Sequence, residues 1–484
     1  MILKDLRQSG VRWGWARFSL SFVLFLFSDF SWASALTLDE VLASVAQNYP
    51  MIVSARMDLE KAQADYLAAQ GGFDPNLKSS LISSVDGYYK NAYTDISVEQ
   101  STALWGTRFY AGWRNGQGSF PIYDAKYATF TGGEFRGGVE VPLLKGGSTD
   151  ERRTRLGTSE RGLELAERGI DAQKIEVNKQ AAFKYWDWVA AGKKLKVAED
   201  LLVISLVRDK GLIDRVKHGD TPQIDQTDNQ RAVVQRKSGV IAAERALQKA
   251  SFELSIFLRD PSGFPRVLSK EYLPVEFPEP KLDETILASG EDSHSISSHP
   301  EVQRFRIQAE QIQMEYQLAK NQVLPRLDFS FGFFSDLGNN PGTTPYLPAY
   351  GDPSEVRLGL TLEFPLFFRS SRGKRDSLSF SLSKLNVMRG LAQDRLQVQL
   401  NDSRQAMKTA LERLDLARKE ISLNQKLEEA ERVRFQHGES NVLMINIREQ
   451  ITRDAWIKEY DALSEFFKSK AELIAAQGVK EISH

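Results

Sequence analysis

The chain has 484 residues, of which 26% are charged and 42% are hydrophobic, and its formal net charge is −1. This near-neutral balance gives no general electrostatic attraction to nucleic acid, so no nucleic-acid partner is expected. The sequence contains no cysteine, which excludes a disulfide framework, thiolate metal ligands and a cysteine nucleophile.

The first 35 residues have the pattern of an export signal. Basic residues from Lys4 to Arg17 precede the short apolar run FSLSFVLFLF, and the small residues ASA end at Ala35. The run is shorter than the ~20 apolar residues of a typical membrane-spanning helix. We therefore expect residues 1–35 to be a signal peptide and the mature chain to begin near Leu36, with an uncleaved membrane anchor as the alternative.

Short landmarks recur in the same order in the two halves of the chain. The matching pairs are Pro50 and Pro300, Pro75 and Pro325, Pro142 and Pro365, and His218 and His437. The spacing is 250 for the first pair (300 − 50) and 223 for the third (365 − 142). The first half therefore carries 27 additional residues (250 − 223), around residues 89–118. This order indicates an internal duplication, with repeats at 36–258 and 299–484 joined by an inter-repeat connection at 259–298.

Three segments alternate between apolar and polar residues, at 135–143, 327–333 and 356–364. A period of two predicts strands with one apolar face, and their lengths suit the ~9–11 residues of a membrane strand. Half-buried strands of a soluble sandwich would alternate in the same way. We expect two strands per repeat and four per chain. The additional residues, in which Trp105, Phe109 and Trp113 are expected on one face, could form a further hairpin or a packed loop.

Two long stretches without proline predict unusually long helices. They run from Pro142 to about His218 and from Pro365 to about His437, which corresponds to about 100 Å each at ~1.5 Å per residue. Apolar residues recur every seven positions along them, which is typical of a coiled-coil seam. The two seams are Ala181, Trp188, Leu195 and Leu202, and Leu400, Met407, Leu414 and Ile421.

A second helix is expected to return after each His-Gly corner, at residues 222–257 and 441–476. Gly219 and Gly438 can adopt the left-handed backbone that a sharp reversal requires. Asp220 and Glu439 are expected at the start of the returning helices, where the helix dipole favours negative charge. The two corners should lie side by side at one end of the molecule.

The sequence resembles the TolC-like outer-membrane efflux proteins. The resemblance extends from Leu36 to about Gly478 and is carried by the opening TLDEVLASVAQNYP, by the PLL and PLF strand ends, and by the paired glycine corners. It implies an α+β membrane protein in which long antiparallel helical hairpins, forming an α-barrel, join the strands of a trimeric twelve-stranded transmembrane β-barrel. Residues 336–353 would be an extracellular loop, and residues 274–282 part of the equatorial connection.

The resemblance also implies a function. The protein would be an exit duct for efflux or type I secretion, located in the outer membrane and extending into the periplasm. It would form a homotrimer, contact outer-membrane lipid, and work with a periplasmic adaptor protein and an inner-membrane transporter. The two corners would be the adaptor-docking tip, made of His218, Gly219, Asp220, His437, Gly438 and Glu439.

The resemblance further implies a pore constriction just beyond the corners. In the first repeat the matching positions carry Asp225 and Asp228, which lie three apart and so share a helix face. In the second repeat they carry Met444 and Ile447, so the constriction could be partly hydrophobic and close by dewetting. The alternative for the two acids is an ordinary solvated helix face.

No enzyme motif is found, and we expect no catalytic activity, cofactor or metal site. His218 and His437 could form a metal pair, but a histidine at a helix C-terminus is also favoured by the dipole. Two other functions remain, a periplasmic coiled-coil adaptor and a structural protein of the cell envelope. An adaptor would carry a single helical hairpin, and a structural coiled coil would not need alternating strands.

Overall fold

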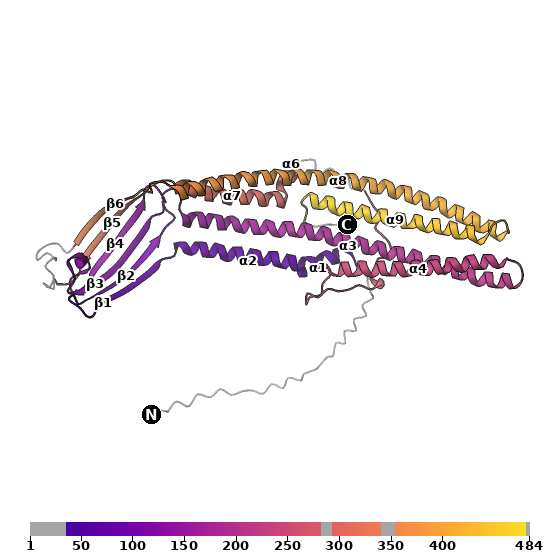
Figure 1. The fold of residues 1–484 in the computed structure, drawn as a ribbon, viewed down its shortest axis with the longest axis horizontal. Coiled ribbons are helices and arrows are strands. Elements are labelled where there is room, and N and C mark those ends of the chain that lie inside the picture. The colour runs from indigo at the N-terminus through magenta and orange to yellow at the C-terminus, as the bar shows by residue number, and fades with distance from the viewer. Residues whose placement is uncertain (1–34, 282–292, 340–353, 481–484) are drawn as a thin grey trace, which may run out of the picture.

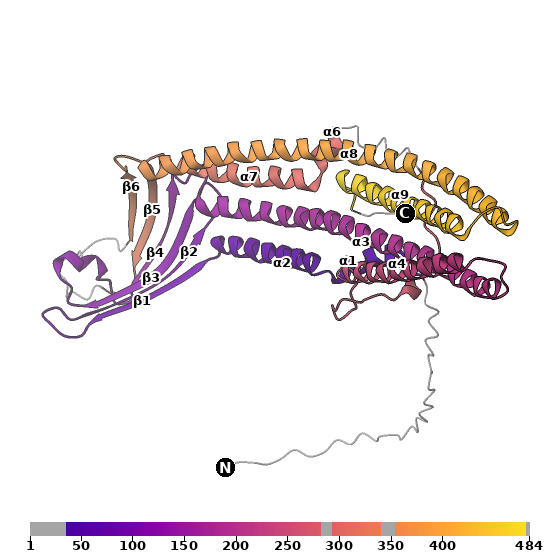
Figure 2. The same ribbon diagram turned by 45° about the vertical axis from the view of Figure 1, so that its right-hand side comes forward.

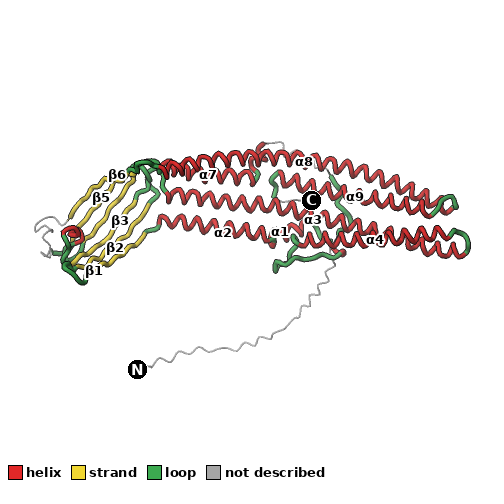
Figure 3. The backbone as a smooth tube through the Cα atoms, viewed as in Figure 1, coloured by secondary structure: helices red, strands yellow, loops and turns green. Residues whose placement is uncertain are grey.

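The molecule is elongated, with a β-sheet at one end and long helices that run from it to the other end (Figure 1). The computed structural model describes residues 35–281, 293–339 and 354–480. The expected signal peptide and most of the expected loop at 336–353 lie outside the described residues. Helices and strands are segregated along the long axis, apart from a short 3₁₀ helix beside the sheet (Figure 3).

Within the described residues, the sheet is antiparallel and has six strands in sequence order. They are β1 (Asn76–Ser84), β2 (Asn91–Ser101), β3 (Arg108–Gly118), β4 (Glu134–Pro142), β5 (Arg326–Asp336) and β6 (Ser354–Glu363). The three alternating segments of the sequence are confirmed as β4, β5 and β6. The expectation of four strands per chain was wrong, and a twelve-stranded barrel of three chains therefore does not follow from this sheet.

The additional residues of the first half form β2 and β3, which pair along their whole length from Asn91↔Gly118 to Ser101↔Arg108. Of the two possibilities, the further hairpin is thus correct. Phe109 and Trp113 share a face of β3, as expected. Trp105 does not join them, because it lies in the turn between β2 and β3 with a positive φ of 54°.

Two long helices and two returning helices form the far end of the molecule. They are α3 (Glu151–Lys217), α4 (Gln223–Ser255), α8 (Arg369–Gln436) and α9 (Val442–Ala476). Helices α3 and α8 have 67 and 68 residues, about 100 Å each at ~1.5 Å per residue. Asp150 caps α3 by accepting from the Arg153 N–H, and Asn441 caps α9 by accepting from the Met444 N–H.

Shorter helices pack beside the long ones. They are α1 (Leu38–Asn48), α2 (Pro50–Gln70), α6 (Ser293–Ser298) and α7 (Pro300–Asn321). Three 3₁₀ helices lie in connecting segments, namely η1 (Gly71–Phe73), η2 (Ile122–Tyr127) and η3 (Lys270–Tyr272). Pro50 and Pro300 each stand at the first position of a helix, where a missing N–H is tolerated. Helix α3 is central, since it packs against α2, α4, α7 and α9.

The main hydrophobic core lies midway along the helices, where α1, α3, α4, α8 and α9 meet. Trp188, Leu400 and Leu414 are fully buried there, so the predicted seven-residue seams are confirmed as packing surfaces. The connection after α4 crosses this core. Phe277 from that connection stacks on Trp186, with ring centroids 5.7 Å apart, and Glu279 forms a 2.9 Å ion pair with Arg418.

Candidate functional site

The sheet has one strongly apolar face. Because directly paired residues of antiparallel strands point to the same side, the register joins the apolar positions of all six strands into one surface. On β6 this surface contains Val356, Leu358, Leu360 and Leu362, which are 60–70% exposed. Such a broad exposed apolar area is unusual for a soluble protein and marks contact with a partner or a membrane.

The opposite face of the sheet is covered by ion pairs. Arg114 pairs with Glu134 at 2.8 Å and Arg136 with Asp95 at 2.6 Å, and all four side chains are largely buried. Further pairs join Lys78 to Glu99, Arg108 to Glu140, and Arg357 to Glu355. Positive and negative groups alternate across neighbouring strands, so this face is polar and close to locally neutral.

The sheet is open at both sides in a single chain. Strand β1 pairs with β2 alone and β6 with β5 alone, so each has one edge without a strand partner among the described residues. Unpaired edges are ready to accept a strand from another chain. Strand β1 lies on the same side of the molecule as α2 and α4, and β6 lies on the same side as α8 (Figures 1 and 2).

The two His-Gly corners have the same local structure. His218 and His437 end α3 and α8, and Gly219 and Gly438 follow with φ of 77° in both cases. At the first corner the Asp220 N–H donates to the Arg215 carbonyl at 2.9 Å, and at the second the Glu439 N–H donates to the Arg434 carbonyl at the same distance. Both are Schellman caps, so the predicted role of the glycines is confirmed.

The corners lie side by side at the end of the molecule farthest from the sheet (Figure 1). Arg215, one turn before the first corner, stacks over the Phe435 ring at the second corner, 5.4 Å from its centroid. The expected position of the two acids was wrong. Asp220 and Glu439 belong to the turns, because α4 begins at Gln223 and α9 at Val442.

The four residues expected at a constriction all lie in the first two turns of the returning helices. Asp225 and Asp228 are half-buried on α4, and Asp228 lies 4.0 Å from Arg231. Met444 and Ile447 on α9 are 36% and 42% exposed. All four positions therefore lie directly beyond the two corners.

A buried charge network near the corners was missed by the sequence analysis. Glu449 on α9 is 1% exposed and forms ion pairs with Arg208 of α3, Arg236 of α4 and Arg432 of α8. Asn446 accepts hydrogen bonds from Arg208 and Arg236. Burial lowers the pKa of Arg236, while the Glu449 carboxylate opposes this shift. One sequence signal could have revealed this network. Glu449 is an acid on the same helix stripe as Ile445 and Thr452, and this stripe of α9 is buried.

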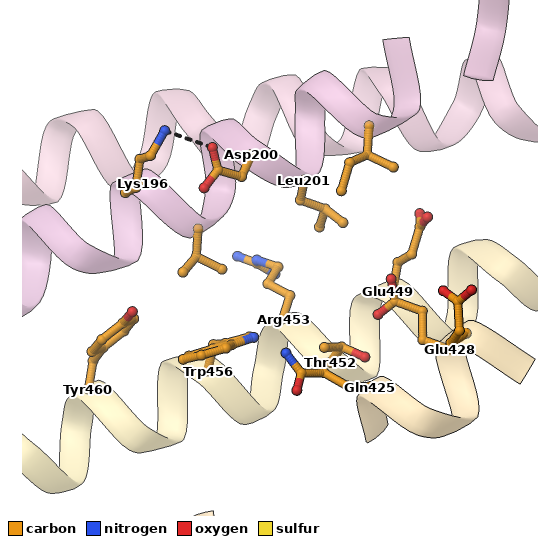
Figure 4. Close-up of a pocket in the computed structure, with 13 residues that line it drawn as sticks. Lys196, Asp200, Leu201, Gln425, Glu428, Glu449, Thr452, Arg453, Trp456 and Tyr460 are labelled. Carbon is orange, nitrogen blue, oxygen red and sulfur yellow. Dashed lines mark ion pairs between the residues drawn. The ribbon is translucent and has the colours of Figure 1, made fainter. Parts of the chain in front are cut away.

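A groove of about 650 Å³ lies beside this network, between α3 on one side and α8 and α9 on the other (Figure 4). Glu428 and Glu449 lie towards one end, and Trp456 and Tyr460 towards the other. Across the groove, Lys196 and Asp200 pair with each other at 2.8 Å. Its lining combines acidic, basic, aromatic and aliphatic side chains.

The described residues contain no group of three or more His, Asp or Glu side chains arranged to hold a metal ion. His218 contacts the Asp214 carbonyl through Nδ1 at 2.7 Å, as expected of a helix-capping histidine. Among the described helices, none combines the length and the apolar character needed to cross a membrane.

No protein-family model and no curated protein matches the sequence. Solved structures do match. The Campylobacter jejuni CmeC outer membrane channel aligns with a TM-score of 0.66 at 14% identity, over 92% of this chain and 86% of that one. The outer membrane protein VceC from Vibrio cholerae aligns with a TM-score of 0.65 at 14% identity, over 91% and 96%.

A third structure, the open state of the Neisseria gonorrhoeae MtrE outer membrane channel, aligns with a TM-score of 0.61 at 13% identity, over 91% of this chain and 88% of that one. At these identities the likeness establishes the fold. The resemblance to TolC-like proteins seen in the sequence is therefore confirmed at the level of the fold.

Proposed function

We propose that this chain, which has the fold of outer-membrane channels, is the exit duct of an efflux or secretion system and acts as a homotrimer in the outer membrane. The observation that carries the proposal is the sheet itself. Among the residues that the structure describes, nothing covers its apolar face, its other face carries ion pairs, and its two edge strands each lack one strand partner. The strands of a membrane barrel have one apolar side, which faces lipid, and one polar side, which faces the interior. The two faces of this sheet match these two sides.

Closure of the sheet requires more than one chain. Lipid offers no hydrogen-bond partner to an open strand edge, so β1 of one copy would pair with β6 of the next. The helices support the same arrangement, because exposed apolar residues run along α8 and α4 on opposite sides of the chain. They are Phe380, Val387, Val398, Leu416 and Leu423 on α8, and Val234, Ile241 and Phe252 on α4. Neighbouring copies would cover these stripes.

The number of copies follows from the resemblance to TolC-like proteins, which implies three. With the six strands that the structure describes in each chain, three copies would close a barrel of eighteen strands (6 × 3) in place of the twelve expected from the sequence. The four helices at the far end would contribute twelve (4 × 3) to the α-barrel below. The two hairpins of nearly equal length support the proposed repeats at 36–258 and 299–484, joined through residues 259–298.

The helices would extend into the periplasm and present the corners to an adaptor protein bound to an inner-membrane transporter. Both corners lie side by side at the end of the molecule farthest from the sheet (Figure 1). We therefore propose that the docking tip consists of His218, Gly219, Asp220, His437, Gly438 and Glu439. Asp225 and Asp228 with Met444 and Ile447 are proposed to narrow the pore just above. No catalytic activity is proposed.

The proposal is tested by membrane fractionation followed by planar-bilayer recording. The chain should be found in the outer membrane, migrate as a heat-dissociable oligomer, and conduct ions in a bilayer after purification. A soluble periplasmic monomer would instead indicate an adaptor or a structural protein. An outer-membrane oligomer without conductance under any voltage or salt condition would contradict the duct.

A further inference from the structure

The connection between β3 and β4 folds back onto the sheet. This segment, residues 119–133, contains η2 and lies at the end of the sheet away from the helices (Figure 2). The Tyr127 ring packs on Tyr93 of β2, with centroids 4.7 Å apart. The Thr129 N–H donates to the Gly116 carbonyl at 3.2 Å, and the Gly116 N–H donates to Thr129 Oγ1 at 3.1 Å.

Gly116 permits this close contact. A Cβ at this position would lie 1.6 Å from the Tyr127 carbonyl oxygen and 3.3 Å from the Phe120 ring. The segment is also fixed at its far end, where the Phe130 N–H donates to Asp336 of β5 at 3.1 Å. Contacts with three strands therefore hold it in place as a packed part of the sheet.

The segment covers only the outer end of the polar face, over β2 and β3. Gly116 is paired with Tyr93, and both point to the side that carries the Arg114–Glu134 and Arg136–Asp95 ion pairs. In a membrane barrel the apolar face contacts lipid, so the polar face lines the interior. The segment would then lie inside the barrel near its outer opening. Tyr123 within it is 78% exposed and projects from the packed region.

We propose that residues 119–133 of each copy narrow the outer mouth of the channel and set the size of the molecules that pass it. This inference rests on the proposed function. With strands ~4.8 Å apart and tilted by ~40°, eighteen strands give a barrel about 36 Å wide, against about 24 Å for twelve. The additional hairpin β2–β3 thus widens the barrel, and the segment that follows it reduces the opening again.

The test uses the absence of cysteine from the chain. Thr361 lies on the polar side of β6, paired with Asp328 near the helical end of the sheet, and is exposed. In Thr361→Cys, a reagent added outside intact cells must pass the outer mouth. A small maleimide and maleimides on polyethylene glycol chains of increasing length are compared. The long reagents should be excluded, and replacing the segment 119–133 by a short Gly-Ser linker should admit them.

Two glycine variants refine the test. Gly116→Val should displace the segment and shift the size limit upwards. Gly137→Val is the matched control, because its Cβ would point to the apolar face and meet ordinary contacts at 3.6 Å and beyond. It should keep the original limit. If Gly116→Val does not assemble, the size limit measured in the linker variant tests the constriction on its own.

Asn339→Cys, at an exposed position three residues beyond the end of β5, controls for reagent access. If it is not labelled from outside, the proposed membrane orientation fails and with it the proposed function. Suppose instead that Asn339→Cys is labelled. The proposed constriction is then overturned if Thr361→Cys has the same size limit in the protein with the segment and in the linker variant. Failure of every reagent to label Thr361→Cys in both proteins would overturn it as well.

Discussion

Glu449 shows how a single residue can join separate elements. Its buried carboxylate balances arginines from α3, α4 and α8, so four helices from both hairpins meet at one group. Desolvation makes a buried charge costly unless each partner is matched. Removing the carboxylate would leave three guanidinium groups near one another without this counter-charge.

We therefore expect Glu449→Gln to lower the free energy of unfolding by about 3 kcal/mol, at the lower end of values for broken buried ion pairs. The measurement is denaturant unfolding of the purified protein in detergent, followed by helical circular dichroism. Glu439→Gln is the control, because that side chain is exposed and should change stability by less than about 0.5 kcal/mol. Equal stability of the two variants would mean that the network contributes no net stabilisation.

The proposed constriction is also tested at single residues. Asp225→Asn with Asp228→Asn removes two charges per chain and six per proposed trimer (2 × 3), which should reduce the cation selectivity of the proposed channel and its block by multivalent cations. Reversal potentials in planar bilayers measure the selectivity. Glu244→Gln, an exposed acid farther along α4, should leave it unchanged. Identical selectivity in the double variant and the wild type would mean that the two acids lie on an ordinary solvated helix face and do not line the pore.

At the scale of elements, long helices and their corners were predictable and several strands were not. The seven-residue seams and the glycines after His218 and His437 carry strong local signals. Strand β1, with the sequence NLKSSLISS, has three apolar residues, and the irregular alternation of β2 hides its apolar side. Their structure comes from pairing with neighbouring strands, which a local pattern does not contain. Glu449 was missed for the same reason, since its partners come from distant helices.

The corner glycines give an element-scale prediction. A Cβ at Gly219 would meet no atom within 4 Å, so Gly219→Ala should cost only the left-handed backbone penalty of about 1 kcal/mol. Gly211→Ala, within α3 and equally free of contacts, should be neutral or stabilising by up to about 1 kcal/mol. Thermal unfolding of both variants compares them directly. A loss of stability in Gly211→Ala equal to that in Gly219→Ala would show that backbone conformation is not the cause.

His299 is buried where α7 meets α9, with 6% of its surface exposed. Its Nε2 donates to the Ala475 carbonyl at 3.3 Å and its Nδ1 accepts from the Glu301 N–H at 3.2 Å, which requires the neutral ring. Burial lowers the pKa of His299 below its usual value of 6.5. The unfolded chain thus takes up the proton at higher pH than the folded chain, so this contribution to stability is complete above pH 6.5 and is lost as the pH falls below it.

We expect unfolding curves between pH 7.5 and pH 5.5, a window of about one unit on either side of the usual histidine pKa, to show a smaller acid-induced loss of stability in His299→Gln than in the wild type. His218→Gln, at an exposed corner, serves as the control and should behave as the wild type. If His299→Gln and the wild type lose the same stability on acidification, other groups cause the pH dependence.

At the scale of the whole molecule, a single chain is incomplete. In the described part of the chain, each edge strand of the sheet lacks one strand partner, and the apolar sheet face and the helix stripes are exposed. All of these surfaces would be covered if copies were joined side by side in a membrane, with β1 next to β6 and α4 next to α8. The number of copies decides the size of the barrel. With the six described strands of each chain, two copies would close twelve strands (6 × 2) and three copies eighteen (6 × 3).

Disulfide cross-linking between the two edge strands tests this assembly most directly. Ser79→Cys on β1 is combined in turn with Leu358→Cys, Leu360→Cys and Leu362→Cys on β6, and Ser79→Cys alone is the control. After oxidation of outer-membrane fractions, at least one pair should give bands of one, two and three chains, with three as the largest. Bands that stop at one or two chains for every pair, or continue beyond three, would contradict a closed ring of three copies.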